Sequence, residues 1–310
     1  MEEKIEIMNL LQNRQILEHE LQLLAYGSIE IRENNSNKYI YVHYREDGVA
    51  LTKYVGEYSE ELYNLVLNNS IKAKELKKKI REINKRLKQL NYTEEELSEK
   101  VEQNIDFAKR HLVDTIYKQA ILEGVATTFA DTESIIEGGK VNNMTSEDVL
   151  KIVNLKHAWE FILNKNVILS NTNFVLLCEI NRMVEEGFYY TAGKIRNTPV
   201  TIGGTIWKPD LPIESVIKEE LGEIFNKDLN DVDVAIELLL YIMKKQIFID
   251  GNKRTAVIYS NHYLISKGKG IIAIPAELTE EFKDLLILYY EGKDEIKIKK
   301  FIKGKCYMNI

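Results

Sequence analysis

One stretch late in the chain concentrates side chains that could bind phosphate together with a cation. Residues Gln246 to Val257 read Gln-Ile-Phe-Ile-Asp-Gly-Asn-Lys-Arg-Thr-Ala-Val. The carboxylate of Asp250 could hold a divalent cation that a polyphosphate would share. Gly251 permits a tight turn and a close approach of the backbone to a ligand. Because Lys253 and Arg254 add positive charge beside them, these residue types indicate a nucleotide-phosphate site.

Two helices must position this stretch. Apolar residues recur at helical spacing from Val232 to Lys245 and again from Thr255 to Lys267. The stretch is therefore predicted to be a loop that ends in a helix N-terminus, where unpaired backbone N–H groups and the helix dipole favour an anion. Asp-Gly-Asn is also ordinary turn chemistry, and Asn or Asp is a routine N-cap. On these few residues alone, the purely structural interpretation stays open.

The longer string resembles the signature of the Fic/Doc family, His-x-Phe-x-Asp/Glu-Gly-Asn-Gly/Lys-Arg-x-x-Arg. The positions that match in register are Phe248, Asp250, Gly251, Asn252, Lys253 and Arg254. The resemblance extends from about Phe107 to the C-terminus. It implies a nucleotide site for ATP and Mg²⁺, with Asp250 as the metal ligand. Gly251, Asn252, Lys253 and Arg254 would then contact the nucleotide.

Two departures from the signature bear directly on activity. The family's general base is the motif histidine, and that position is Gln246 here. The family's final arginine, which contacts the γ-phosphate of the nucleotide, is Val257 here. A neutral amide can orient a hydroxyl by hydrogen bonding but cannot take its proton. We therefore expect the chain to bind nucleotide and Mg²⁺ while turning over slowly or not at all.

The resemblance implies a protein-modifying enzyme and leaves three functions open. Fic enzymes transfer AMP from ATP to a hydroxyl of a target protein. The first candidate is a Fic-like protein adenylyltransferase that Gln246 impairs. The Doc branch lacks the final arginine and transfers phosphate, so Lys253 and Val257 favour a Doc-like phosphoryl transferase as the second. The third is a non-catalytic protein that senses nucleotide.

A segment upstream of the motif resembles the family's flap, a β-hairpin that lays the target segment beside the nucleotide by backbone pairing. Ala192 to Arg196 and Pro199 to Gly204 carry the resemblance. The residues expected to dock the target in such a flap are Thr201, Ile202, Gly203 and Gly204. A plain surface hairpin is the alternative interpretation.

A second segment resembles the family's inhibitory helix, Ser/Thr-x-x-x-Glu-Gly/Asn. Glu137 and the glycine after it match the end of that pattern, but the Ser/Thr position is Glu133, with Ser134 alongside. In relatives, this glutamate pairs with the final motif arginine. Because Val257 replaces that arginine, Glu137 could pair with Arg254 instead. A Glu-Gly at a helix C-terminus is otherwise an ordinary stop signal.

The chain is predicted to be mainly α-helical, with two domains. Residues 1–91 form an N-terminal module, in which helices over 3–24 and 59–90 pair as an antiparallel stalk. Between them lies a small β-meander, with strands over 28–32, 39–44 and 50–55. Residues 92–310 form the Fic-type helical bundle with its β-hairpin flap. Its expected helices cover residues 149–163, 171–186, 213–225, 232–245, 252–267, 279–292 and 294–306.

Charge and hydropathy exclude several classes of protein. A formal net charge of −6 leaves no strongly basic face for nucleic acid. No apolar run reaches membrane-spanning length, and the first residues do not resemble a signal peptide, so we expect a cytoplasmic protein. Its expected partner is a protein with a modifiable hydroxyl. The stalk also offers a surface for a homodimer contact or another partner.

Overall fold

The computed structural model describes residues 2–34, 37–46, 49–90, 92, 97–142 and 144–310. The chain forms two compact units, Met1–Glu94 and Glu95–Ile310. The domain boundary predicted after residue 91 lies close to this division. None of the helices in the described part of the chain is both long enough and apolar enough to cross a membrane.

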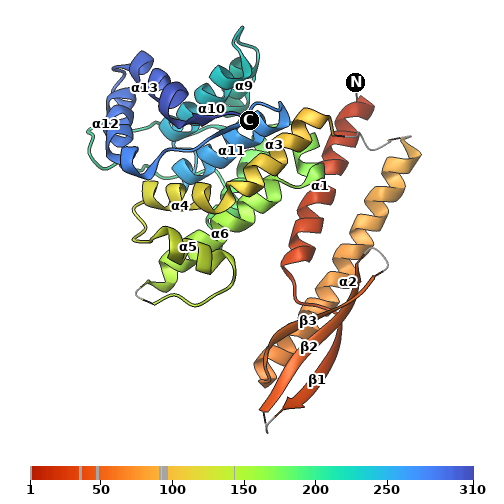
Figure 1. Ribbon diagram of the computed structural model, residues 1–310. Helices are drawn as coiled ribbons and strands as arrows, with labels where there is room; N and C mark the ends of the chain where they lie inside the picture. Colours follow the sequence, from red (N-terminus) through yellow and green to blue (C-terminus); the bar gives the residue numbers. More distant parts are fainter. Residues whose placement is uncertain (1, 35–36, 47–48, 91, 93–96, 143) are drawn as a thin grey trace. The chain divides into compact units, whose positions relative to one another are not determined.

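The first unit is a helical hairpin that carries a three-stranded sheet (Figure 1). Its elements in chain order are α1 (Glu2–Leu23), β1 (Ser28–Asn34), β2 (Asn37–Glu46), β3 (Val49–Glu57) and α2 (Glu60–Gln89). The strands pair antiparallel in the order β1-β2-β3. Ile40 and Val42 of the central strand are fully buried and form a small core with Val66 of α2. The predicted meander is therefore confirmed.

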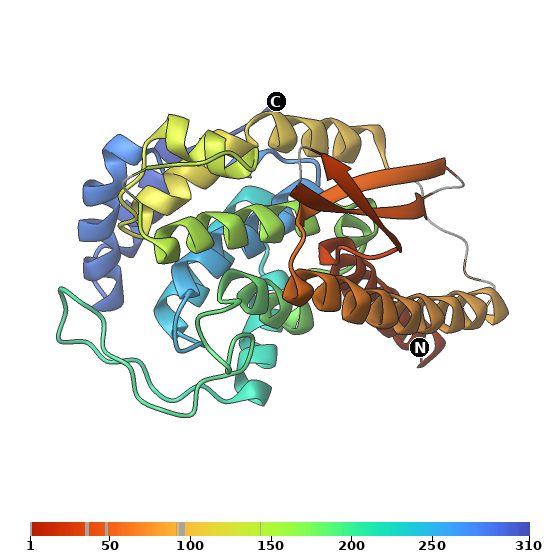
Figure 2. The ribbon, with the colours of Figure 1, turned by 90° about the horizontal axis from the view of Figure 1, so that it is seen from below.

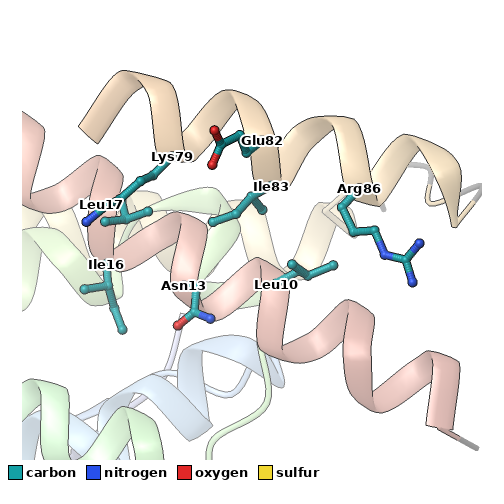
Figure 3. A pocket seen from close by; sticks show the side chains of 8 residues that line it. All are labelled: Leu10, Asn13, Ile16, Leu17, Lys79, Glu82, Ile83 and Arg86. Carbon is teal, nitrogen blue, oxygen red and sulfur yellow. The ribbon is translucent and has the colours of Figure 1, made fainter. Parts of the chain in front are cut away.

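Helices α1 and α2 lie antiparallel, as two ion pairs between them require. Glu6 pairs with Arg86 at 2.6 Å, while Glu20 pairs with Lys72 at 2.6 Å, so one end of α1 meets the opposite end of α2. An open groove of about 440 Å³ lies between these helices, and Figure 3 shows the side chains that line it. Apolar side chains such as Leu10 and Ile83 line it. The apolar contact between the two predicted stalk helices is thus only partly closed.

The second unit is almost entirely helical. Its helices are α3 (Glu99–Arg110), α4 (Leu112–Leu122), α5 (Phe129–Ile136), α6 (Ser146–Ile162), α7 (Lys165–Leu169), α8 (Phe174–Val184), α9 (Glu214–Phe225), α10 (Asp231–Lys245), α11 (Asn252–Ser266), α12 (Thr279–Tyr290) and α13 (Glu295–Phe301). The expected helices of this unit are present within a few residues of their predicted bounds. The last predicted helix is shorter, because a π-helical turn at Ile302–Cys306 ends it.

Helix α11 lies at the centre of the second unit. Its residues from Arg254 to Ile265 are all buried, so it has no solvent-facing polar stripe. Its polar side chains bond to backbone instead. Asn261 donates to the carbonyls of Val257 and Ile272, both at 2.8 Å, and accepts from the N–H of Ile272. These bonds fix the short strand pair β4 (Ile271–Ile272) and β5 (Tyr307–Met308) beside the helix.

The predicted β-hairpin flap is wrong in one respect: the segment is a loop and not a hairpin. Residues 197–212 all lie in the described part of the chain, and none of them has strand conformation. Three prolines, Pro199, Pro209 and Pro212, lack the N–H that a strand ladder needs. We call residues 197–212 the flap loop. In Figure 2 it forms the long teal-green excursion between α8 and α9.

Candidate functional site

The candidate site is the turn between α10 and α11, which we call the motif loop (residues 246–251). Gln246 ends α10 in the left-handed conformation, with φ 49°, and Gly251 precedes α11 with φ 72°. No side chain caps α11. Its first-turn N–H groups therefore have no side-chain acceptor, which suits them to bind an anion. The predicted loop and helix N-terminus are present in the fold.

A buried asparagine holds the motif loop in shape. The side chain of Asn252 accepts a hydrogen bond from the N–H of Phe248 at 3.0 Å and donates to the carbonyl of Phe248 at 2.8 Å. It also donates to the side-chain oxygen of Gln246 at 3.2 Å. The predicted nucleotide contact of Asn252 thus competes with its bonds inside the loop.

Gln246 is itself engaged by the protein. Its side-chain nitrogen donates to the carbonyl of Met243 at 2.6 Å, while its oxygen accepts from Asn252. The side chain therefore closes the end of α10 and braces the loop. An amide in these bonds supplies no basicity at the position where the family resemblance places the base.

Arg254 points into the protein. Its side chain is 2% exposed and lies 2.7 Å from the carboxylate of Glu185. The carboxylates of Glu123 and Asp250 approach it at 3.7 and 3.9 Å. Burial raises the pKa of Glu185 to about 7, although the charge of Arg254 opposes that rise. Arg254 is therefore a partner of buried carboxylates before it is a ligand of phosphate.

Lys253 is the more accessible cation of the motif. Its side chain is 31% exposed, and its nitrogen lies 3.6 Å from the carboxylate of Glu123. This half-buried ammonium shares Glu123 with Arg254, so it can turn toward another anion without leaving that carboxylate unpaired. Of the two predicted basic contacts, Lys253 is the one whose environment permits it to meet a ligand.

Gly251 is required by the approach of Glu185. A β-carbon at this position would lie 2.3 Å from the side-chain oxygen of Glu185, so the carboxylate would have to move away. The positive φ of 72° adds a second reason, because side chains other than glycine rarely adopt it. The glycine thus lets a buried carboxylate reach the first turn of α11.

Asp250 has the surroundings that a nucleotide-bound Mg²⁺ needs. Its side chain is 51% exposed, and one of its oxygens accepts from the N–H of Gly251 at 2.7 Å. Among the described residues, no group of three or more metal-ligating side chains converges. Mg²⁺ usually takes only one or two carboxylates and fills its shell with waters and phosphate oxygens. The donor set therefore fits Mg²⁺ carried by a polyphosphate and not a cation cage built by the protein alone.

Two further buried residues bond to the backbone of the motif loop. Asn181 of α8 donates to the carbonyl of Asp250 at 3.1 Å and accepts from the N–H of Gly193 at 2.9 Å. Arg196, which is 3% exposed, donates to the carbonyl of Gln246 at 2.5 Å. The sequence had marked Arg196 only as part of a flap-like string. Asn181 carried no signal in the sequence, because an asparagine inside a helix resembles any other surface polar residue.

The flap loop exposes the residues that the sequence predicted to dock a target. Thr201, Gly203 and Gly204 are exposed, while Ile202 packs partly against the core of the unit. The tip is tied to α12: the hydroxyl of Thr205 donates to Glu291 at 3.0 Å. Nearby, the ring of Trp207 stacks on Tyr290 with centroids 5.6 Å apart.

The predicted inhibitory residues lie at the end of α5. Glu137 is the exposed C-cap of this helix, and Ser134 accepts, through its carbonyl, from the N–H of Gly139 at 2.7 Å. The suggested pair between Glu137 and Arg254 is not formed, since Glu123, Glu185 and Asp250 surround that arginine instead. Glu137 behaves here as the ordinary helix stop that the sequence also allowed.

Part of the chain matches a protein-family model. Residues 171–264 match the model of the Fic/DOC family. This stretch of the chain is similar to a Fic domain. The matched segment contains α8, the flap loop, α9, α10, the motif loop and most of α11. A comparison with curated proteins gives no match.

Solved structures with Fic domains share the fold. A Fic domain containing signaling protein from Bacteroides thetaiotaomicron superposes with a TM-score of 0.52 at 19% identity, covering 61% of this chain and 75% of that one. A fragment of Fic-1 from C. elegans gives 0.53 at 17% identity, covering 79% and 73%. A Fic family protein from Desulfovibrio desulfuricans gives 0.53 at 13% identity, covering 69% and 74%. At these identities the likeness extends to the fold.

Proposed function

We propose that this protein binds ATP with Mg²⁺ at the N-terminus of α11 and belongs functionally with the Fic enzymes that transfer AMP to a hydroxyl of a target protein. The observation that carries the proposal is the uncapped helix N-terminus, which follows a glycine turn and lies beside the half-exposed carboxylate of Asp250. The flap loop beside it would receive the target segment. Mg²⁺, when bound, would neutralise charge on the phosphates of the nucleotide.

The protein's own residues supply positioning more than proton transfer. Asn252 and Asn181 keep the loop in one shape, so a phosphate would meet N–H groups that are already in place. Gln246 can hold the target hydroxyl by a hydrogen bond but cannot remove its proton. The expected activity of the chain as it stands is therefore close to background.

Calorimetric titration with ATP and Mg²⁺ tests the proposal. Asp250→Ala should abolish the dependence of ATP binding on Mg²⁺, since the variant lacks the carboxylate that shares the cation. Asp106→Ala is a suitable control, because this exposed carboxylate lies on α3, whose Asn104 bonds to Gly270 beyond the C-terminal end of α11, far from the motif loop. Binding of ATP that Asp250→Ala leaves unchanged, in strength and in Mg²⁺ dependence, would contradict the assignment of the loop.

A second candidate function is transfer of phosphate instead of AMP. Two observations favour it: Lys253 is the accessible cation of the loop, and Val257 is 2% exposed where the family signature has an arginine for the γ-phosphate. The mass added to target protein by the Gln246→His variant distinguishes the two reactions, because AMP and phosphate differ in mass. ATP binding without any transfer by that variant would favour a protein that only senses nucleotide.

A further inference from the structure

Arg196 occupies a position that joins three parts of the site. Its guanidinium is buried and makes three hydrogen bonds, each to a backbone carbonyl. The nitrogen Nε donates to Gln246 at 2.5 Å, Nη1 donates to Thr198 at 2.9 Å, and Nη2 donates to Asp210 at 2.6 Å. The N–H of Arg196 also donates to the carbonyl of Ile247 at 3.0 Å.

Two of these acceptors are the two ends of the flap loop. Thr198 lies where the loop leaves the fold and Asp210 lies where it returns, so one side chain closes the loop at its base. A hairpin would close itself with a ladder of backbone hydrogen bonds. Residues 197–212, all of them described, make no backbone–backbone hydrogen bond with one another. The guanidinium fork therefore takes over the role of the missing ladder.

The third acceptor connects the two ends of the flap loop to the position of the motif residue Gln246. Gln246 stands where the resemblance places the general base, and its carbonyl receives the Nε proton of Arg196. Because guanidinium is planar and rigid, the directions of its three bonds fix the carbonyls of Thr198 and Asp210 relative to Gln246. This side chain therefore holds both ends of the flap loop against residue 246.

We infer that Arg196 is a positioning residue: it holds the flap loop in register with position 246, so that a target segment laid along the loop presents its hydroxyl there. The inference rests on the proposed function for the role of the loop. It assigns Arg196 to the target, whereas Asp250 and the first turn of α11 serve the nucleotide. Backbone groups of the loop that have no internal partner remain able to pair with an extended segment of target.

The fluorescence of Trp207 can report on the flap loop. The chain has two tryptophans. Trp159 is 1% exposed and donates to Gln119, whereas Trp207 lies half-buried in the flap loop against Tyr290. Quenching of fluorescence by acrylamide therefore reports mainly on Trp207, and a Trp159→Phe background removes the other signal.

Three variants separate the role of the fork from the roles of charge and of general stability. Arg196→Met removes all three side-chain bonds. Arg196→Lys keeps the charge but cannot span three carbonyls from one nitrogen atom. Lys194→Met is the matched control, since Lys194 is an exposed cation two residues earlier in the same segment. Thermal unfolding of each variant shows whether the fold survives.

We expect both Arg196 variants to raise the quenching of Trp207 while ATP–Mg²⁺ binding, measured by calorimetry, stays as in the unaltered chain. In the Gln246→His background, labelled ATP and total lysate protein give a ratio of label transferred to protein over label released by hydrolysis. That ratio should fall by about tenfold or more in both Arg196 variants. The hydroxyl of the target would lose its alignment, whereas hydrolysis of ATP by water does not depend on the flap loop. Lys194→Met should leave quenching and ratio unchanged.

The outcomes are distinct. Quenching and transfer ratio that remain unchanged in folded Arg196→Met would overturn the inference, as would weakened ATP binding with the ratio intact. Normal behaviour of Arg196→Lys would show that charge alone suffices and would overturn it too. Loss of the fold in both variants would make Arg196 a structural residue. If Gln246→His alone transfers no label, the proposed function fails instead, and the quenching of Trp207 then decides whether Arg196 holds the loop.

Discussion

The motif loop and the flap loop lie next to one another in the fold and are held in opposite ways. In the motif loop, buried side chains bond to backbone at close range: Asn252 braces Phe248, and Asn181 holds Asp250. In the flap loop, the backbone makes no hydrogen bond with itself across its described residues. Side chains secure its base, through Arg196, and its tip, through Thr205 and Trp207.

This difference separates a motif loop that must be preformed from a flap loop that must adapt to the backbone of a target. Phosphate transfer depends on positioned N–H groups and charges, so a preformed motif loop reduces the cost of ordering them when the nucleotide binds. A target protein brings its own backbone, and an unpaired loop can accept it as an added strand. Substitutions in the motif loop should therefore cost stability or rate, whereas matched substitutions in the flap loop should cost little of either.

The largest effect is expected when Arg254 is replaced. Arg254→Met leaves Glu185 buried without its cationic partner, and breaking a buried ion pair in this way costs about 3–5 kcal/mol in the free energy of unfolding. Lys253→Met is the matched control: its side chain is 31% exposed, so we expect a loss of less than about 1 kcal/mol. Denaturant titration at pH 8, where Glu185 is charged, measures both values.

That ordering changes what the sequence predicted for the basic pair. From the motif alone, Lys253 and Arg254 were both expected to contact the nucleotide. Its burial against Glu185 indicates that its first role is to stabilise the loop. Equal, small losses of stability in the two variants would restore the original expectation and contradict the structural role.

The next effect concerns rate. Gln246→His places an imidazole at the position of the family's base, and we expect transfer to rise by about two orders of magnitude. Gln246→Asn is the control, because it keeps a neutral amide. His262 cannot serve instead: it is fully buried, its ring nitrogens bond to Thr172 and Val167, and burial lowers its pKa to about 4. Robust transfer by the unaltered chain would point to another base.

A smaller effect compares one glycine from each loop. Gly251→Ala puts a β-carbon against Glu185 at a positive φ, and such strain costs about 1–3 kcal/mol in the free energy of unfolding. A β-carbon on Gly203 of the flap loop would meet no atom within 4 Å. Gly203→Ala should therefore change the free energy of unfolding by roughly a few tenths of a kcal/mol. Comparable losses in both variants would mean that the two loops are equally constrained.

Much of the fold could be predicted because its signals are local. Apolar spacing marks α10 and α11, and the Asp-Gly-Asn turn between them marks the motif loop. The flap loop could not be predicted in the same way. Val200 to Ile202 has β-type residues, but a strand forms only with a partner, and prolines on both sides remove the donors a ladder needs.

The acidic residues of the site carry no local signal. Glu123 and Glu185 follow the last turns of α4 and α8, where a glutamate near a glycine reads as a helix stop on the surface. Their burial is decided by where Arg254 arrives, far away in the chain. The signal available in the sequence was indirect, since a buried arginine needs a carboxylate partner from somewhere in the fold.

The last effect is a dependence of stability on pH that originates in Glu185. Burial raises the pKa of this carboxyl in the folded protein to about 7, above the ordinary value of 4.5. The folded state therefore binds a proton that the unfolded state releases, up to about one per molecule between these two pH values. Stability should fall as the pH rises through this window, which is the opposite of the usual behaviour of a salt-bridged carboxyl. Other carboxyls, among them Glu30, have lowered pKa values, so their contribution to stability increases as the pH rises.

The informative quantity is thus the difference in stability between the unaltered chain and Glu185→Gln, followed by thermal unfolding from pH 5 to pH 8. We expect the variant to lose the falling component, whereas Glu186→Gln, the exposed neighbour, should keep it. Parallel curves for the unaltered chain and Glu185→Gln would mean that Arg254 keeps Glu185 charged throughout, and the motif loop would then rest on a permanent ion pair.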